Sequence, residues 1–488
     1  MSHSKTIVII GGGVSGLAAA FQAQSSLPDA SVILLEANDR VGGVLQTEKI
    51  QCNGGEYLIE QSADMFVSDP PSAMQLIEQL GKTDQLLRTK PTIDRAYVAT
   101  KDLIHPVPRG LSLMLPNKLE AVLKSPLLDE AAKRRFAQER DVVARSSDED
   151  ESLESFAVRR FGQSVFEQLI QPLVSGIYTA DPKKLSMHAT MARFVEMERE
   201  HGSLIRAAEF ANAKNKKPLV VASENADNET SGARYGLFRA PEKGMSQLVG
   251  WIVDALKRTT LRTSCKVEAV VKKDSKWSIQ FRTGHANDPE TIQADGLVLA
   301  TPARVSAKVL SELDGELSGL LSTIKAASSA IVVLGLDQRQ FSRQFDGYGI
   351  IVPSVLNRNV IATSFASNKF EGRTGEGKVL IRSFIGGALQ PELVELDDCE
   401  LIKLATEELE RTVGFSGEPE LSRVYRWRNC MPQYHLGHLQ RVSKIEALVS
   451  SYAGLELAGN SYHGVGIPAC IESGFEAIGR LVKALNHG

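Results

Sequence analysis

The sequence has few cysteines and no excess of charge. Its five cysteines are scattered, odd in number and without CxxC spacing: Cys52, Cys265, Cys399, Cys430 and Cys470. This pattern is expected in a reducing compartment and argues against a structural zinc site, so we predict no metal. The net charge of −3 over 488 residues gives no electrostatic reason to expect a nucleic-acid partner.

Long apolar runs are also absent from the sequence. No stretch approaches the roughly 18 uninterrupted apolar residues of a membrane span, and the start, MSHSKTIVII, lacks the apolar core and cleavage site of a signal peptide. We therefore expect a cytoplasmic protein. The leucine-rich, proline-broken stretch from Ile104 to Leu128 allows two interpretations: peripheral contact with the inner face of the membrane, or simple covering of neighbouring helices. A homodimer is also compatible with the sequence.

The sequence does contain a dinucleotide-binding pattern near its start. Ile7 to Ile10 form a short apolar run, which is typical of a strand covered on both faces in a parallel sheet. Gly11, Gly13 and Gly16 follow with G-x-G-x-x-G spacing at the start of an alanine-rich helix. The first glycine permits a tight turn, the second lets the backbone approach a pyrophosphate, and the third lets helix and strand pack closely.

An acid and a second glycine turn follow this pattern. The strand expected at 31–35 ends in Glu36, whose carboxylate can accept hydrogen bonds from a ribose. A few residues later, Arg40 precedes the glycine pair Gly42 and Gly43. A plain NAD site does not need this turn, whereas the longer flavin dinucleotide does, so the pattern favours FAD.

A second helix start lies near the end of the chain. Residues 455–458 are expected to form a strand, 459–467 a loop with three glycines, and Pro468 begins a helix with one apolar stripe. A helix N-terminus preceded by a glycine-rich loop favours negative charge. We expect that charge to develop on a reduced flavin ring.

The chain is too long for one compact core, so several domains are expected. We predict an α/β fold in which a Rossmann-type FAD-binding domain comprises 1–90, 235–303 and 445–488. An inserted α+β substrate-binding domain comprises 91–110 and 304–444, with strands near 330–336, 348–352, 360–366 and 378–385. A helical subdomain at 111–211, the candidate for membrane association, contains an acidic run at 148–151 that we interpret as a solvated loop and helix N-terminus. Residues 212–234 are polar and expected to be a mobile loop.

Taken together, these stretches resemble a known family. IVIIGGGVSGLAAA (7–20) and LLEANDRVGG (34–43) are shared by the amine oxidase-like flavoproteins in general. Three other stretches are similar to the flavin-dependent porphyrinogen oxidases of haem biosynthesis: 155–189, WRNCMPQYHLGHLQRV (427–442) and LAGNSYHGVGIPACIESG (457–474). The loop after Glu60, QSADMF, departs from the family's glycine-proline turn.

The resemblance implies the site residues and the reaction. No catalytic side chain is expected, because FAD carries the chemistry. An apolar slot for a porphyrinogen is implied at Gly176, Ile351 and Phe384, with Arg95 binding a propionate. The FAD contacts implied are Gly11, Gly12, Gly13, Val14, Ser15, Gly16, Glu36, Ala37, Arg40, Gly43, Val44, Ser62, Ala63, Asp64, Met65, Val267, Asn460, Val465, Gly466 and Ile467.

The expected reaction is oxidation of a porphyrinogen to the porphyrin, with dioxygen as acceptor and hydrogen peroxide as product. Residues 62–71 contain no lysine or arginine, which favours protoporphyrinogen IX over the more carboxylated coproporphyrinogen III. One alternative is another flavoenzyme of the group, an amine oxidase or a carotenoid desaturase, with Phe384 and Tyr462 as an aromatic pair. A second alternative is a non-catalytic FAD-binding redox sensor.

Overall fold

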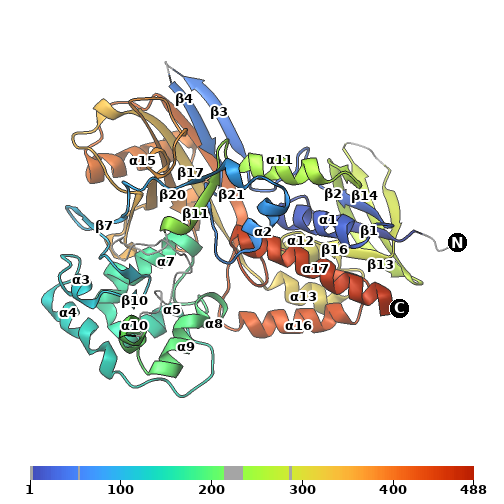
Figure 1. Cartoon of the computed structure of the whole chain (residues 1–488), viewed down its shortest axis with the longest axis horizontal. Coiled ribbons are helices and arrows are strands. Elements are labelled where there is room, and N and C mark those ends of the chain that lie inside the picture. The colour runs from blue at the N-terminus through green and yellow to red at the C-terminus, as the bar shows by residue number, and fades with distance from the viewer. Residues whose placement is uncertain (1–3, 53–54, 214–234, 285–287, 488) are drawn as a thin grey trace.

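The computed structural model describes residues 4–52, 55–213, 235–284 and 288–487 (Figure 1). A five-stranded sheet with its helices occupies one end of the elongated molecule. A seven-stranded sheet lies at the other end, beside a group of helices (Figure 1). The α/β fold expected from the sequence is confirmed, whereas the domain boundaries given above stay a prediction.

The five-stranded sheet is parallel throughout, and β1 (Thr6–Ile10) lies at its centre. Alternate side chains of a strand face opposite sides. Ile7 and Ile9 therefore pack against helices on one side, and Val8 and Ile10 against the other. The remaining strands are β12 (Thr259–Arg262), β2 (Ser31–Leu35), β16 (Gly296–Leu299) and β22 (Leu455–Leu457).

Each face of this sheet has its own cover. The Ile7 face is covered by α1 (Val14–Ser26), α2 (Ser72–Gln79), α11 (Met245–Ala255) and α17 (Ile467–His487). The Val8 face is covered by an antiparallel sheet of β13 (Cys265–Lys273), β14 (Lys276–Thr283) and β15 (Glu290–Ala294), together with α12 (Ala303–Val309), α13 (Gly315–Ser322) and α16 (His438–Ser450).

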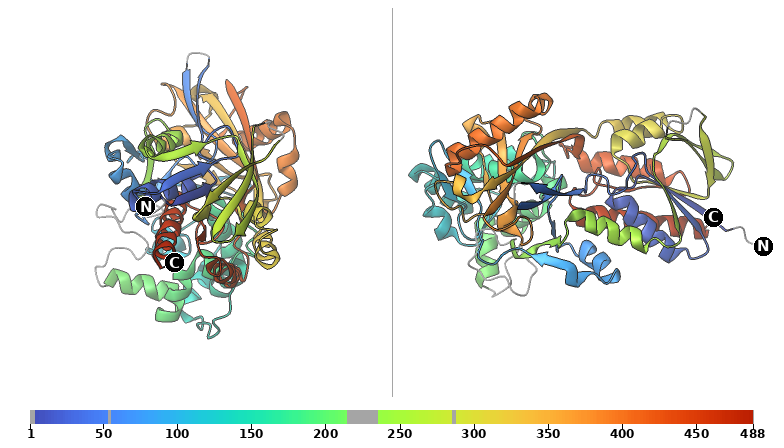
Figure 2. Two further views of the ribbon diagram at one scale, coloured as in Figure 1. Left: turned by 90° about the vertical axis from the view of Figure 1, so that its right-hand side faces the viewer. Right: turned by 90° about the horizontal axis from the view of Figure 1, so that it is seen from above.

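The first and last helices of the chain cross closely. A Cβ atom at Gly474 in α17 would collide with the Ser15 carbonyl and lie 3.2 Å from the Ala18 Cβ in α1. Only glycine allows this approach. The crossing places the starts of α1 and α17 at the same edge of the sheet, and it brings the two ends of the chain to one end of the molecule (Figure 2).

The seven-stranded sheet includes the four strands predicted above and three more. Its order is β21 (Leu421–Pro432), β17 (Ala326–Asp337), β20 (Lys378–Gly386), β19 (Val360–Phe365), β18 (Gly349–Ile351), β7 (Tyr97–Ala99) and β8 (Ile104–Pro106). Helix α15 (Asp398–Val413) covers one face. The other face meets β4 (Gly55–Glu60), which pairs with β3 (Thr47–Cys52). Short strands β5 (Phe66–Val67), β11 (Phe238–Pro241) and β6 (Leu86–Arg88) join the two halves.

The helical region surrounds a separate apolar core. It contains α3 (Leu119–Leu123), α4 (Glu130–Ala137), α5 (Leu153–Phe161), α7 (Gln171–Tyr178), α8 (Met187–Thr190), α9 (Ala192–His201) and α10 (Leu204–Ala213). Residues 212 and 213 end α10, and the rest of the predicted mobile loop lies outside the described residues. No helix within the described ranges is long and apolar enough to cross a membrane.

The stretch from Ile104 to Leu128 mainly covers this core. Val107, Leu111, Leu115 and Leu128 are buried among the helices. Leu103, just before the stretch, is 56% exposed. The burial supports the second of the two interpretations given for this stretch.

Candidate functional site

The first glycine turn has the shape that a pyrophosphate requires. A Cβ at Gly11 would lie 2.5 Å from the Ala300 carbonyl oxygen, and one at Gly16 would collide with the Gly11 carbonyl. A Cβ at Gly13 would meet no heavy atom within 4 Å. Gly13 precedes the first residue of α1, so open space adjoins the helix N-terminus, where backbone N–H groups bind anions. The turn therefore fits a dinucleotide.

Glu36 shapes this turn. Its side chain is buried, and the carboxylate accepts hydrogen bonds from the Gly12 N–H at 2.6 Å and from the Asn38 N–H at 2.8 Å. The Asn38 side-chain amide donates a third hydrogen bond at 2.6 Å. A carboxylate has further lone pairs for a ribose, so that role stays a prediction. The structural role was missed because no spacing rule links this acid to Gly12.

Arg40 holds the second glycine turn. Its guanidinium donates to the carbonyls of Gly43 at 2.8 Å and Val41 at 3.2 Å. The Gly42 N–H donates to the Gly12 carbonyl at 2.7 Å, which fastens the second turn to the first. A Cβ at Gly43 would lie 3.2 Å from the Gly13 Cα. The arrangement makes the two turns one unit.

The segment 62–65 is bonded to this unit and is held by two cationic side chains, Lys369 and Arg382. The Ser62 hydroxyl donates to the Val44 carbonyl at 2.5 Å. Asp64 is buried, and its carboxylate pairs with Lys369 at 2.9 Å and Arg382 at 3.1 Å. Burial alone would raise the pKa of Asp64, but the two cations outweigh it and hold the pKa well below its usual range. Arg382 also donates to the Ser62 carbonyl.

A buried acid lies next to this cluster. Glu60 is 2% exposed and accepts hydrogen bonds from the Met245 N–H at 2.8 Å and the Thr47 hydroxyl at 2.9 Å. It thereby satisfies a donor at the start of α11. Burial raises the pKa of Glu60 to about 7, because desolvation disfavours the charged form.

The C-terminal loop reaches the same edge of the sheet. The Asn460 carbonyl accepts a hydrogen bond from the Tyr434 hydroxyl at 2.6 Å, and the Ser461 hydroxyl accepts one from the Ala303 N–H at 3.1 Å. Gly466 is exposed, whereas Ile467 is buried in the core. The loop therefore ends at the firmly packed start of α17.

The other predicted cofactor residues lie on these segments or beside them. Val14 and Ser15 begin α1. Val267 is buried on β13, whose Cys265 N–H donates to the Glu36 carbonyl at 2.8 Å. Those with partly or fully exposed side chains are Ala37, Val44, Ala63, Met65 and Val465. The structure thus gathers these segments at the carboxyl edge of the parallel sheet, where open α/β sheets bind ligands.

Two of the predicted substrate residues stand in one row of the seven-stranded sheet. Ile351 is paired with Ala362, and Ala362 with Phe384. Directly paired residues point to the same face, which is the face turned towards β4. Both Ile351 and Phe384 are half-buried, and the Arg382 guanidinium lies 5.3 Å from the centre of the Phe384 ring. The row forms an apolar wall.

Gly176 and Arg95 lie on or next to elements that adjoin this row. Helix α7 contacts β18 and β19; its Gly176 is exposed, and a Cβ there would meet no heavy atom within 4 Å. Arg95 precedes β7, next to β18 in the sheet. Its side chain is 32% exposed and donates to Asp94 at 2.9 Å, and Arg109 lies 3.2 Å from the same carboxylate. Sequence reasoning missed Arg109, because only the fold brings it to Asp94.

Tyr462 does not form the aromatic pair considered above. Its ring is 4% exposed and packs in the core between the parallel sheet and β13 to β15. Phe384 packs against a different cluster, on the seven-stranded sheet. The expectation of a Phe384–Tyr462 pair is therefore wrong, because tertiary packing directs the Tyr462 ring into the core.

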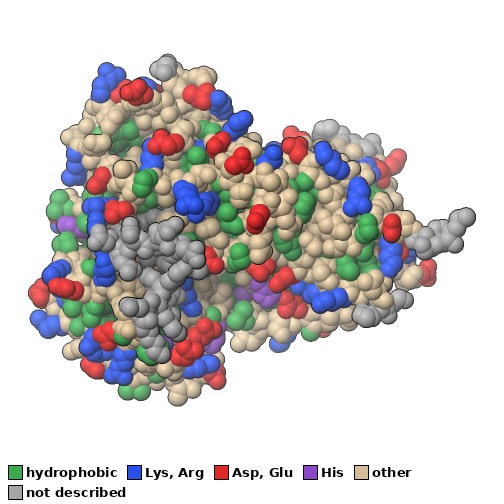
Figure 3. Space-filling model, viewed as in Figure 1, with side chains coloured by type: hydrophobic (Ala, Val, Ile, Leu, Met, Phe, Trp, Pro, Cys, Tyr) green, Lys and Arg blue, Asp and Glu red, His purple; other side chains and the backbone are tan. Residues whose placement is uncertain are grey.

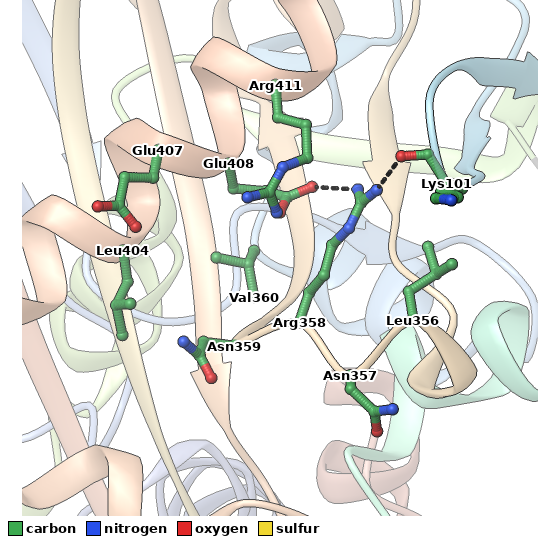
Figure 4. A pocket seen from close by; sticks show the side chains of 10 residues that line it. All are labelled: Lys101, Leu356, Asn357, Arg358, Asn359, Val360, Leu404, Glu407, Glu408 and Arg411. Atoms are coloured by element: carbon green, nitrogen blue, oxygen red, sulfur yellow. Dashed lines mark hydrogen bonds and ion pairs between the residues drawn. The ribbon is translucent and has the colours of Figure 1, made fainter.

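A cavity of about 570 Å³ between the helical region and the sheet lies next to the predicted substrate residues, since Ser175, Val352 and Ile361 in its lining adjoin Gly176, Ile351 and Ala362 in the chain. Besides apolar side chains, the lining contains three acids, Glu154, Glu167 and Asp181, and two cations, Lys183 and Arg358. Such a lining does not suit a ligand with several carboxylates. In the neighbouring pocket of about 400 Å³, Arg358 pairs with Glu408 at 3.1 Å and donates to two carbonyls (Figure 4). Arg358 in this pocket is thus bound to neighbouring groups of the protein itself.

The surface shows no single sign of charge on the face in Figure 3. Lysine and arginine side chains alternate there with aspartate and glutamate over the described residues. An extended basic patch would be needed for nucleic acid. The mixed surface on this face agrees with the small net charge.

Comparison with known proteins gave consistent matches over the whole length. The model of the family "Flavin containing amine oxidoreductase" matches residues 14–481. The coproporphyrinogen III oxidase of Bacillus subtilis (strain 168) is 33% identical over 97% of this chain and 97% of its own. The enzyme of the same name from Staphylococcus aureus (strain NCTC 8325 / PS 47) is 27% identical over 99% and 100%. A crystal structure from Exiguobacterium sp. 255-15, provisionally named a protoporphyrinogen oxidase, covers 98% of both chains with 28% identity and a TM-score of 0.83.

Proposed function

The chain belongs to the flavin containing amine oxidoreductases, and from that premise we propose that it is an FAD-dependent porphyrinogen oxidase of haem biosynthesis. Relatives with this kind of activity in their names match nearly the full chain. The observation that carries the proposal is the apolar row Ile351, Ala362 and Phe384 on the sheet face that meets β4. Arg382 links that face to the segment 62–65.

The residues of the first site fit FAD. When bound, FAD supplies the redox chemistry. Gly13 leaves room for the pyrophosphate at the start of α1, and the helix N-terminus favours its negative charge. The N-terminus of α17 favours negative charge in the same way. Glu36 and Arg40 keep the two glycine turns in shape.

The residues of the second site fit a porphyrinogen, which is a large apolar ring with carboxylates at its edge. The apolar row can hold the ring, and the absent side chain of Gly176 leaves room beside it. Arg95 can bind a carboxylate in bidentate fashion, with two parallel hydrogen bonds. No side chain in this arrangement needs to act as a catalytic acid or base.

The two candidate porphyrinogens differ in their number of carboxylates. The loop 62–71, which contains no lysine or arginine, favoured protoporphyrinogen IX. Arg95 and Arg109 lie beside two carboxylates, Asp94 and Asp346, so the charges there balance and do not favour the more carboxylated substrate. Relatives of this chain, in contrast, are named coproporphyrinogen III oxidases. Comparing kcat/KM for the two substrates decides between them.

Anaerobic reduction of the bound flavin tests the proposal. We expect purified protein to retain FAD and its visible flavin absorbance to bleach when either porphyrinogen is added without oxygen. Admission of dioxygen, the proposed acceptor, should restore the absorbance with release of hydrogen peroxide. Bound FAD that neither porphyrinogen bleaches would instead support the redox-sensor alternative. Protein without FAD would contradict both.

Replacing Arg95 separates substrate binding from cofactor binding. Arg95→Ala should raise KM for the porphyrinogen at least about tenfold, because a hydrogen bond to a charged group contributes about 1.5–3 kcal/mol. The dissociation constant for FAD should stay unchanged. The matched control is Arg339→Ala, which removes a 90% exposed arginine that follows β17 of the same sheet. An equal loss of FAD affinity would remove Arg95 from the substrate site.

We further propose a cytoplasmic location. Peripheral membrane contact would have to involve residues beyond the buried leucines of 104–128. Flotation with vesicles of anionic and neutral lipids measures such contact, and sedimentation measures the proposed dimer.

A further inference from the structure

The side chains of Tyr434 and His438 hold the C-terminal loop by hydrogen bonds to the backbone of every second residue from 460 to 464. We call residues 459–466 the flavin loop. Its Asn460 carbonyl accepts a hydrogen bond from the Tyr434 hydroxyl at 2.6 Å, and its Gly464 N–H donates to the same hydroxyl at 2.8 Å. Between them, the Tyr462 carbonyl lies 2.8 Å from Nε2 of His438. One phenol therefore bridges two backbone groups, four residues apart.

The two rings form one rigid support. Tyr434 and His438 stack with centroids 3.9 Å apart and planes 12° from parallel. Both side chains are buried, with exposed fractions of 2% and 0%. Burial lowers the pKa of His438 to about 4, so the ring is neutral at physiological pH and Nε2 carries the proton that the Tyr462 carbonyl accepts.

The helical region fixes the segment that carries these rings. Asp150 accepts hydrogen bonds from the Gly437 N–H at 2.9 Å and the Ser186 hydroxyl at 2.8 Å. The Ser186 N–H donates to the Tyr434 carbonyl at 2.8 Å. Asp150 belongs to the acidic run interpreted above as a solvated loop. The run does lead into the N-terminus of α5 at Leu153, as expected, but the solvated-loop part of that interpretation is wrong for Asp150 and for the buried Glu151, which pairs with Arg159 at 2.9 Å.

We propose that Tyr434 is a positioning residue for the flavin, acting through the flavin loop, and that Asp150 holds Tyr434 in place from the helical region. The inference rests on the proposed function, because it requires FAD at the start of α17. Only a hydroxyl can accept from Gly464 and donate to Asn460 at once. The loop therefore depends on the hydroxyl oxygen of Tyr434. The helical region supports the cofactor site by holding the segment that carries this hydroxyl.

Tyr434→Phe tests the proposal, with Tyr452→Phe as matched control. The Tyr452 hydroxyl also makes a hydrogen bond, to Asp314 at 3.0 Å, but it lies at the far end of α16. We expect Tyr434→Phe to raise the dissociation constant for FAD about tenfold, which corresponds to about 1.4 kcal/mol, and to change the midpoint potential and visible circular dichroism of the bound flavin. Tyr452→Phe should change none of these. Unchanged values in Tyr434→Phe, or equal changes in the control, would overturn the proposal.

Asp150→Asn tests whether the helical region holds Tyr434 in place. It also provides a test of the proposal if Tyr434→Phe does not fold. It weakens the acceptor for Gly437 without touching the flavin loop, so we expect a smaller rise in the FAD dissociation constant, of a few fold, with the same spectral change. An unchanged dissociation constant and spectrum would contradict the link to the helical region. Failure of the wild-type protein to bind FAD would contradict the proposed function itself. If the wild type binds FAD and neither Tyr434→Phe nor Asp150→Asn changes its dissociation constant or spectrum, only this inference is contradicted.

Discussion

The segments that gather at the cofactor site differ in where their support comes from. The first glycine turn is held by Glu36 and Gly42, which bond to Gly12 and follow it soon in the chain. The segment 62–65 depends on Lys369 and Arg382, 305 and 320 residues away from their partners along the chain. The glycines of the first turn form a motif that local spacing reveals, whereas the distant partners of 62–65 appear only once the chain has folded.

The largest expected effect comes from breaking the local unit. Gly16→Ala places a Cβ against the Gly11 carbonyl and should destabilise the fold by more than about 4 kcal/mol, because backbone atoms cannot move aside. The control Gly13→Ala enters open space, so it should fold normally and lose FAD affinity. Urea unfolding of the apoproteins and FAD titration distinguish these results. Equal stability of the two variants would contradict the close packing at Gly16.

The next effect comes from breaking the distant support. Asp64→Asn leaves Lys369 and Arg382 buried without their counter-charge, which should cost about 3–5 kcal/mol in the free energy of unfolding. The control Glu395→Gln breaks an exposed pair with Arg428 and should cost at most about 1 kcal/mol. If both variants lose similar stability in urea, the distant support is no stronger than a surface ion pair.

A pH series sharpens the comparison at Glu60. Its pKa is about 7 in the fold against 4.5 in the unfolded chain, so the folded state binds the proton more tightly. The stabilisation is complete below about pH 4.5 and is lost as pH rises through 7, by up to about 3 kcal/mol. Glu60→Gln should remove this part of the pH dependence. Parallel stability curves of the wild type and the variant from pH 5 to 8 would contradict the raised pKa.

The smallest expected effect concerns the second turn. Arg40→Lys keeps the charge but loses the planar group that reaches Val41 and Gly43 together. We expect the FAD dissociation constant to rise by up to about tenfold, with little change in the free energy of unfolding. A large loss of stability would mean that this turn supports the whole fold.

The same contrast explains what could be predicted. Strands β1, β2 and β17 to β20 and helix α17 were expected, since apolar runs and one apolar stripe mark them in the sequence. Strand β21 was missed because Arg423, Arg426 and Arg428 interrupt any apolar pattern in LSRVYRWRNCMP. In the fold, Arg426 and Arg428 pair with Asp398 and Glu395. Its strand character comes from pairing with β17, which local composition does not reveal.

The candidate site follows the same rule. Ile351 and Phe384 were named through a resemblance rather than through spacing; the sheet pairs both with Ala362, and their substrate role stays a prediction. Lys369 and Arg382 were not named because their partners lie 305 and 320 residues away in the sequence, and Tyr434 was not named because no spacing rule links it to the flavin loop. Their common signal is burial of a polar side chain, which requires the fold.

The crossing of α1 and α17 has a consequence for the order of events during synthesis. A ribosome makes α1 long before β22 and α17, because they lie at opposite ends of this sequence. Until then one side of the parallel sheet lacks its edge strand and a covering helix, and α1 lacks the partner that fits against it at Gly474. Domains fold as units once their parts are present. The helix that follows the first glycine turn therefore reaches its final packing only after α17 has been made.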